Sequence, residues 1–92
     1  MNYQVFYHPD IFKIDLLKIP NNIKNIIKTA IEQRLAQYPL ESGSPLKYSL
    51  KGHRKLRVGD YRIIYRLESN KIIILMIGHR KEAYLKIFTR SK

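Results

Sequence analysis

The chain has 92 residues, 45% of them hydrophobic and 11% aromatic, which is enough for one compact core and too little for two. We therefore expect a single domain over residues 1–92. The absence of cysteine excludes disulfides and thiolate metal sites. The sequence begins with no export signal, and no stretch approaches the roughly 20 apolar residues that span a bilayer. A cytoplasmic protein with no membrane contact is the expectation.

Positive charge is concentrated in the second half of the chain. The formal net charge is +11, yet residues 1–46 contain five Lys and Arg against four Asp and Glu. Residues 47–92 contain thirteen against three. Such a patch attracts polyanions, and nucleic acid is the first interpretation. An acidic protein, a membrane surface, or solubility alone are the alternatives.

The first half of the sequence predicts one strand and two helices. Aromatic and β-branched residues at 3–7 predict a strand that ends before Pro9. Apolar residues at helical spacing within 10–19 predict a short helix that ends at Pro20. A longer apolar stripe over 23–38 predicts a second helix, ended by Pro39, and the following Ser, Gly and Pro residues predict a loop.

The second half changes to a period of two, which is typical of strands. Residues 54–58 and 61–67 alternate around a Gly59-Asp60 turn and predict a hairpin. Residues 71–77 are almost all apolar and predict a strand buried on both faces. Residues 79–88 form either a loop or a short final helix, and the helix would turn Ala83, Ile87 and Phe88 inward.

These elements give an α+β fold with the order β-α-α-β-β-β and, at the end, either that loop or a short C-terminal helix. Two N-terminal helices are expected to pack on one face of a mainly antiparallel four-stranded sheet. The opposite face of the sheet is then left for function.

Strand alternation predicts which side chains share that face. His53, Lys55 and Arg57 should point away from the helices, whereas Arg54, Leu56 and Val58 should point toward them. Neighbouring strands add further cationic or titratable groups, namely Arg62, Arg66, His79 and Arg80. A solvated basic face with no further role is the alternative interpretation.

The chemistry available to such a surface does not require a metal or another cofactor, and we expect neither. The three histidines are far apart in the sequence and acids are few. An RNA strand can be cut by its own 2′-hydroxyl if the protein moves the protons and stabilises the negative charge on phosphorus. Arg and Lys supply the charge stabilisation, and His, Tyr or Lys can transfer protons.

Two motifs carry a family resemblance. The hairpin contains the run R-V-G-D-Y-R-I-I-Y at 57–65, and the apolar strand ends in G-H-R-K-E-A-Y at 78–84. In this order, after one strand and two helices, they resemble the RelE/ParE toxin superfamily of type II toxin-antitoxin systems. RelE-like members cleave mRNA in the ribosomal A site, whereas ParE-like members inhibit DNA gyrase.

The resemblance implies roles for individual residues. Arg62 corresponds to the arginine that contacts the scissile phosphate, and Arg80 to a second phosphate-stabilising arginine. Lys55 corresponds to a lysine that acts near the attacking or leaving oxygen, and Tyr84 to a tyrosine that orients the nucleotide or acts as a base. His53 stands where the best-studied relatives have a lysine, so it either replaces that lysine in proton transfer or marks a different site.

The resulting expectation is an mRNA-cleaving, metal-independent endoribonuclease. Its expected catalytic residues are Lys55, Arg62, Arg80, Tyr84, His53 and His79. Its expected RNA-binding residues are Lys51, Arg54, Arg57, Arg66 and Lys81. The expected partners are mRNA, the ribosome and a small acidic antitoxin. A ParE-like gyrase inhibitor and a basic RNA-binding module without catalysis are the alternatives.

Overall fold

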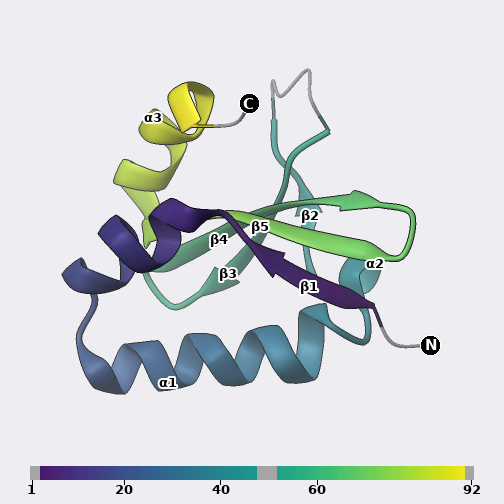
Figure 1. The fold of residues 1–92 in the computed structure, drawn as a ribbon, viewed down its shortest axis with the longest axis horizontal. Helices are drawn as coiled ribbons and strands as arrows, with labels where there is room; N and C mark the ends of the chain where they lie inside the picture. Colours follow the sequence, from purple (N-terminus) through teal and green to yellow (C-terminus); the bar gives the residue numbers. More distant parts are fainter. Residues whose placement is uncertain (1–2, 48–51, 91–92) are drawn as a thin grey trace.

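A computed structural model describes residues 3–47 and 52–90 of the chain. One sheet with the strand order β1-β5-β4-β3-β2 forms its centre (Figure 1). The strands are β1 (Gln4–Tyr7), β2 (Ser44–Pro45), β3 (Arg54–Val58), β4 (Tyr61–Glu68) and β5 (Lys71–His79). β1 runs parallel to β5, and the other neighbours are antiparallel. The expected α+β class is confirmed, and the short strand β2 makes five strands where four were expected.

Helical segments cover both faces of this sheet. η1 (Ile11–Asp15) and η2 (Leu16–Lys18) follow β1, α1 (Asn21–Ala30) continues as η3 (Ile31–Leu35), α2 (Pro39–Ser42) is one turn, and α3 (Arg80–Arg90) is the final helix. In Figure 1, α1 runs below the sheet and α3 stands above it. The face opposite to the first helical segments, which was expected to be left for function, is covered in part by α3.

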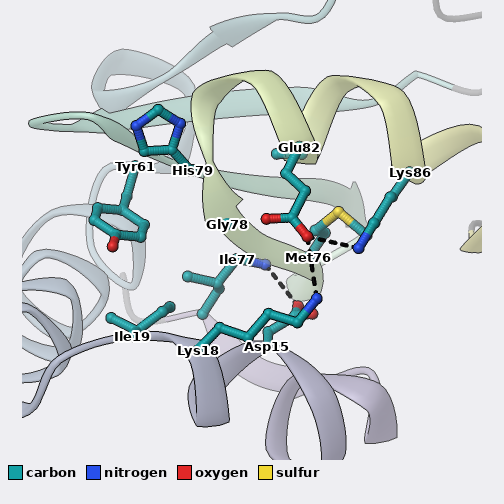
Figure 2. A pocket seen from close by; sticks show the side chains of 11 residues that line it. Asp15, Lys18, Ile19, Tyr61, Met76, Ile77, Gly78, His79, Glu82 and Lys86 are labelled. Carbon is teal, nitrogen blue, oxygen red and sulfur yellow. Dashed lines mark hydrogen bonds and ion pairs between the residues drawn. The ribbon is translucent and has the colours of Figure 1, made fainter.

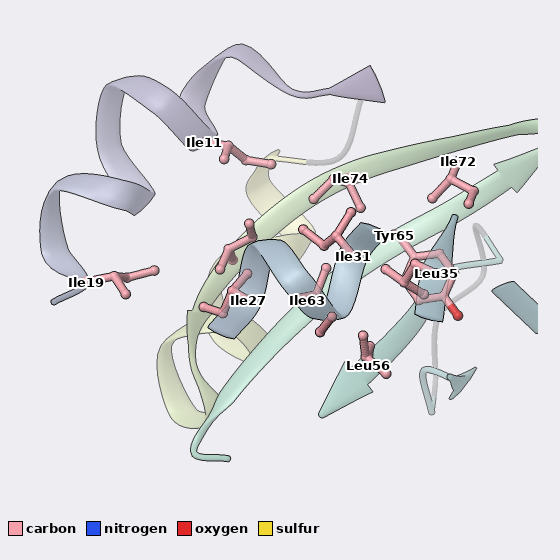
Figure 3. Packing of buried hydrophobic residues seen from close by; sticks show 12 residues of the cluster. Ile11, Ile19, Ile27, Ile31, Leu35, Leu56, Ile63, Tyr65, Ile72 and Ile74 are labelled. Atoms are coloured by element: carbon pink, nitrogen blue, oxygen red, sulfur yellow. The ribbon is translucent and has the colours of Figure 1, made fainter. Parts of the chain in front are cut away.

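The larger core lies between the sheet and the first helical segments (Figure 3). Its residues come at helical spacing from η1 to η3 and at alternate positions of the strands, and each side chain of this kind contributes roughly 1.5–3 kcal/mol when fully buried. Those labelled in Figure 3 are Ile11, Ile19, Ile27, Ile31, Leu35, Leu56, Ile63, Tyr65, Ile72 and Ile74. The packing of the two N-terminal helical segments on one face is confirmed.

A smaller core lies on the opposite face, under α3. Ile64, Leu75 and Met76 of the sheet pack there against Ala83 and Ile87 of the helix. The register between β4 and β5 shifts between Ile64 and Tyr65. The prediction that the 71–77 strand is buried on both faces is confirmed.

The final helix forms because its apolar positions match this second core. Ala83 and Ile87 are fully buried, as expected for one inward face. Phe88 is 59% exposed, so its expected inward orientation is wrong. It is one position beyond Ile87, which rotates it about 100° away from the core.

The segment after Pro39 forms a helical turn and a short strand where a loop was expected. Pro39 starts α2, consistent with the preference of proline for the first turn of a helix. Its carbonyl accepts a hydrogen bond from the Tyr65 hydroxyl at 2.7 Å. Arg54 donates to the carbonyls of Leu40 and Gly43 at 3.0 and 3.2 Å.

Beyond the end of β1, a side chain hydrogen-bonds to the free edge of β5. β1 pairs with β5 only as far as Ile74. Farther along the strand, the buried Asp15 carboxylate accepts a hydrogen bond from the Ile77 amide at 2.9 Å. Within the described ranges, none of the helices combines the length and the apolar character needed to cross a membrane.

Candidate active site

Arg62 lies at the centre of the surface that carries the expected site residues. It points from β4 toward α3, and only 6% of it is exposed. Its Nη1 donates to the carbonyls of Gly59 and Tyr61 at 3.0 and 2.9 Å, and its Nε donates to the Tyr84 hydroxyl at 3.0 Å. The guanidinium is therefore held in one orientation by the hairpin turn and by α3.

Tyr84 connects Arg62 to Lys55. The Lys55 ammonium lies 5.5 Å from the centre of the Tyr84 ring, within the range of a cation–π contact. The hydroxyl of the same ring accepts the bond from Arg62, so its own proton is free to be donated to a ligand. These three side chains come from β3, β4 and α3, and the fold brings them together as expected.

Two further arginines lie close to this group. Arg57 is exposed on β3 and is the register partner of Arg62 across the hairpin. Arg80 is the first residue of α3, and its amide donates to the Asp60 carbonyl at 2.9 Å, which places the Arg80 backbone beside the hairpin turn that also binds Arg62. We name the surface formed by Lys55, Arg57, Arg62, Arg80 and Tyr84 the cationic surface.

A groove of about 340 Å³ adjoins the cationic surface along α3. Its lining consists of Leu46, Lys47, Lys55, Tyr84 and Phe88. Tyr84 and Phe88 are one helical turn apart, so they face the groove from the same side of α3. Tyr84 thus belongs both to the cationic surface and to the groove.

The two expected catalytic histidines lie outside the cationic surface. His53 is only 2% exposed and precedes β3, so a substrate has little access to it. His79 is exposed, but it pairs with Tyr61, whose ring lies edge-on at 5.8 Å. Tyr61 packs on the larger core, which places His79 on the face of the sheet opposite to Arg62.

His79 contributes instead to a small pocket of about 60 Å³ between η2 and α3 (Figure 2). Glu82 lies in this pocket, with Lys86 Nζ at 2.6 Å and Lys18 Nζ at 3.1 Å from its Oε1 atom. These two ammonium groups, Lys86 first, lower the pKa of Glu82 to about 2. The pocket therefore holds an ion network that joins α3 to η2.

The expected RNA-binding residues are spread over several places. Arg54 lies on the face of the larger core and holds the α2 loop. Arg66 forms an ion pair with Glu68 at 2.7 Å near the far end of the hairpin. Lys81 is exposed on α3, whereas Lys51 lies outside the described residues. Of the four residues in this set that the structure describes, Arg57 alone belongs to the cationic surface.

The charge of the cationic surface favours anionic ligands. All four charged side chains in it are positive, and the tyrosine hydroxyl adds a neutral hydrogen-bonding group. In the part of the chain that the structure describes, no three His, Cys, Asp or Glu side chains come together as metal ligands. A phosphate group matches the surface, because arginine forks and a lysine can neutralise its oxygens.

Comparisons with known proteins agree with this architecture. The family described as "ParE toxin of type II toxin-antitoxin system, parDE" matches residues 5–84. Because this match spans most of the sequence, the chain belongs to that family of toxins. The resemblance inferred from the two motifs is thereby confirmed.

Individual relatives carry RelE-type names. Toxin RelG of Mycobacterium tuberculosis is 35% identical over 72 residues, which cover 76% of this chain and 83% of that protein. The solved toxin-antitoxin complex RelBE2 from the same organism is 30% identical, has a TM-score of 0.78, and covers 87% of this chain and all of the matched chain. The RelB-RelE complex of Methanococcus jannaschii is 27% identical with a TM-score of 0.68, over 86% of this chain and 94% of the matched one.

Sequence reasoning missed the residues that hold α3 in place and those that line the groove. Asp15 of η1 pairs with Arg90, and Lys18 of η2 pairs with Glu82, so both segments are joined to α3 across most of the sequence. No local pattern marks such long-range pairs. The spacing of Tyr84 and Phe88 was the available signal for the groove, because residues four apart share one face of a helix.

Proposed function

We propose that the chain is the toxin of a toxin-antitoxin pair and acts as a metal-independent endoribonuclease on mRNA at the ribosomal A site. The observation that carries this proposal is the contact of Arg62 with Tyr84 beside Lys55. A buried, oriented guanidinium next to a proton-donating hydroxyl and an ammonium group suits phosphodiester cleavage. Membership of the toxin family supports the biological role.

The proposed reaction uses the nucleophile of the RNA itself. The 2′-hydroxyl gives up its proton, its oxygen bonds to phosphorus, and the P–O5′ bond breaks. The products are a 2′,3′-cyclic phosphate and a 5′-hydroxyl, whose oxygen takes up a proton. Arg62 and Arg80 stabilise the extra negative charge on phosphorus, Lys55 in its neutral form takes up the 2′-hydroxyl proton, and Tyr84 gives its hydroxyl proton to the departing 5′-oxygen.

An acidic antitoxin is the proposed protein partner. The solved relatives named above are complexes of toxins with their antitoxins. An acidic segment would be attracted to the cationic surface and would exclude RNA from it. Since the substrate is mRNA on the ribosome, the proposed place of action is the cytoplasm.

Growth arrest and mRNA cleavage test the proposal together. Expression of the unmodified chain should stop growth and should give cleavage at codon-spaced positions in primer extension. Arg62→Ala and Arg80→Ala should each lose both effects while keeping the fold. Arg34→Ala is the matched control, since this arginine is exposed on η3 and away from the cationic surface. Full toxicity of both site variants would contradict the proposal.

Gyrase inhibition is the second candidate, because the matching family is named for ParE toxins. A gyrase inhibitor would induce the DNA-damage response and leave mRNA intact. The same induced cultures distinguish the two functions, and codon-spaced cleavage without DNA damage supports the nuclease. A module that binds RNA without cutting it would give neither signal.

A further inference from the structure

We infer that the Gly59-Asp60 turn positions the proposed active site, and that Gly59 is a positioning residue for the cleavage reaction. Gly59 touches no reacting atom. Its left-handed backbone sets where the Arg62 side chain and the Arg80 backbone lie relative to β3, which carries Lys55. This inference rests on the proposed function and deepens it by naming a residue that acts through the others.

Two successive carbonyl groups of the turn bind the two arginines. The Gly59 carbonyl accepts a hydrogen bond from Arg62 Nη1 at 3.0 Å. The next carbonyl, that of Asp60, accepts the backbone amide of Arg80 at 2.9 Å. Arg62 lies on β4 and Arg80 begins α3, so one short turn binds both elements that supply the arginines. A rotation of the turn would move both acceptors together.

The conformation of the turn depends on a left-handed residue at its first position. β3 ends at Val58 and β4 begins at Tyr61, so Gly59 and Asp60 form a two-residue connection. Gly59 has a φ of 60°. Among the non-glycine residues in the described ranges, only Ser69 has a positive φ, so Asp60 does not. Glycine with positive φ at the first position is the pattern of a type II′ turn. A β-branched side chain disfavours this φ and would rotate the turn carbonyls relative to β3.

The orientation of Arg62 depends on this turn. The guanidinium donates from Nη1 to the carbonyls of Gly59 and Tyr61 and from Nε to the Tyr84 hydroxyl. In the part of the chain that the structure describes, its Nη2 atom donates no hydrogen bond. Nη2 is therefore the group left to bind a phosphate oxygen. The bonds to the hairpin set the direction in which it points.

The turn can be changed without disturbing either core. Gly59 and Asp60 are exposed, and neither belongs to the two clusters of buried residues. A Cβ atom at Gly59 would have no neighbour within 4 Å. A substitution there acts through the backbone conformation. A role in positioning can therefore be separated from a role in folding.

Closure of the hairpin is the competing role of Gly59. The opposite end of β4 offers a matched position, because Ser69 lies in the turn to β5 and has a φ of 55°. The Asn70 carbonyl at that turn accepts the amide of Gln4, which is not part of the cationic surface. A role in hairpin closure predicts equal effects at both turns, whereas a role in positioning predicts an effect on cleavage at Gly59 alone.

The test compares Gly59→Val with Ser69→Val, since both place a β-branched residue in the left-handed backbone of a hairpin turn. In mRNA cleavage on programmed ribosomes, kcat should fall roughly tenfold or more in Gly59→Val with little change in KM, because small misplacements of reacting groups are costly. Ser69→Val should keep its kcat although its thermal midpoint falls similarly. Gly59→Asn should restore most of kcat, because asparagine accepts left-handed backbone. Gly59→Ala is the milder variant and replaces Gly59→Val if the latter does not fold.

A second readout does not depend on cleavage. The NMR resonance of the Arg62 Nε–H group should shift in Gly59→Val and stay in place in Ser69→Val. Three results would overturn the inference: equal losses of kcat in the two valine variants, cleavage at the full rate by Gly59→Val, or no recovery in Gly59→Asn. An unmodified chain that never cuts RNA refutes only the nuclease, and the Nε–H resonance still tests the turn.

Discussion

Arg90 Nη1 lies 2.6 Å from Asp15 Oδ2, and both side chains are more than nine-tenths buried. The pair joins the last described turn of α3 to η1, and the same carboxylate oxygen accepts the Ile77 amide. α3 is therefore attached to the first helical segment and to β5 at once. Because α3 supplies Tyr84, this distant ion pair holds one side of the cationic surface in place.

Removal of the arginine should destabilise the fold strongly. Arg90→Ala leaves the buried Asp15 carboxylate without its cation, and breaking a buried pair in this way costs about 3 kcal/mol. Guanidinium unfolding should show a lower midpoint with an unchanged slope. Lys13→Ala, at an exposed position of η1, should change the midpoint little. A cost below roughly 1 kcal/mol for Arg90→Ala would mean that the pair does not anchor α3.

Loss of the Tyr84 hydroxyl should affect catalysis more than folding. Tyr84→Phe keeps the ring under Lys55 but removes the acceptor of the Arg62 Nε bond. We expect single-turnover RNA cleavage to fall roughly 100-fold, the lower limit for a lost proton-transfer group. The free energy of unfolding should change by about 1 kcal/mol.

Tyr38→Phe controls for the substitution itself, since Tyr38 is 57% exposed and lies before α2. It should leave both cleavage and stability unchanged. A Tyr84→Phe variant that cleaves at the full rate would remove this hydroxyl from the proposed mechanism.

The ion network of Glu82 should make stability depend on acid pH. Its folded-state pKa of about 2 lies below the ordinary value of 4.5. The stabilisation is therefore fully present above pH 4.5 and is lost as the pH falls toward 2. Because Glu82 is partly exposed to solvent, we expect only roughly 0.5 kcal/mol. The difference between the unmodified chain and Glu82→Gln should disappear near pH 2 and in concentrated salt, and a difference that persists there would contradict this origin.

Gly43 should not tolerate a side chain. A Cβ atom built there meets the Tyr65 hydroxyl and lies 2.5 Å from the Lys55 carbonyl oxygen. Gly43→Ala must therefore displace either β3 or the Tyr65–Pro39 hydrogen bond, and we expect a loss of about 1–3 kcal/mol, typical of overpacking. Gly59→Ala tests the opposite case, because no atom lies within 4 Å of its Cβ position and only its positive φ of 60° is strained. Thermal melts of both variants check the order, and a larger loss for Gly59→Ala would reverse it.

Much of the fold could be predicted because its core follows simple periods. Residues in β4 alternate between the two faces of the sheet. The structure places Tyr61, Ile63 and Tyr65 on the larger core, and Arg62 and Ile64 on the opposite face, as predicted. The length of α3 could not be predicted from such periods. Its second core depends on Leu75 and Met76, which lie side by side in the sequence and are both buried at the register shift between β4 and β5.

The candidate site was only partly predictable for a related reason. Lys55 and Arg62 follow strand alternation, and both reach the cationic surface. His79 does not, because its register partner is Tyr61, whereas Arg62 pairs with Gly78. Register of this kind depends on the whole sheet, and a shift of one residue exchanges the two faces.

Arg57 and Arg62 face each other across the hairpin, and like charges in such positions oppose folding. The charges that attract a polyanion thus lower the stability of the protein when no polyanion is bound. A polyanion at a hundredfold excess over its dissociation constant would return about 2.7 kcal/mol of stability. The free energy of unfolding therefore rises when a polyanion occupies the cationic surface, and the folded chain is less stable when that surface is empty.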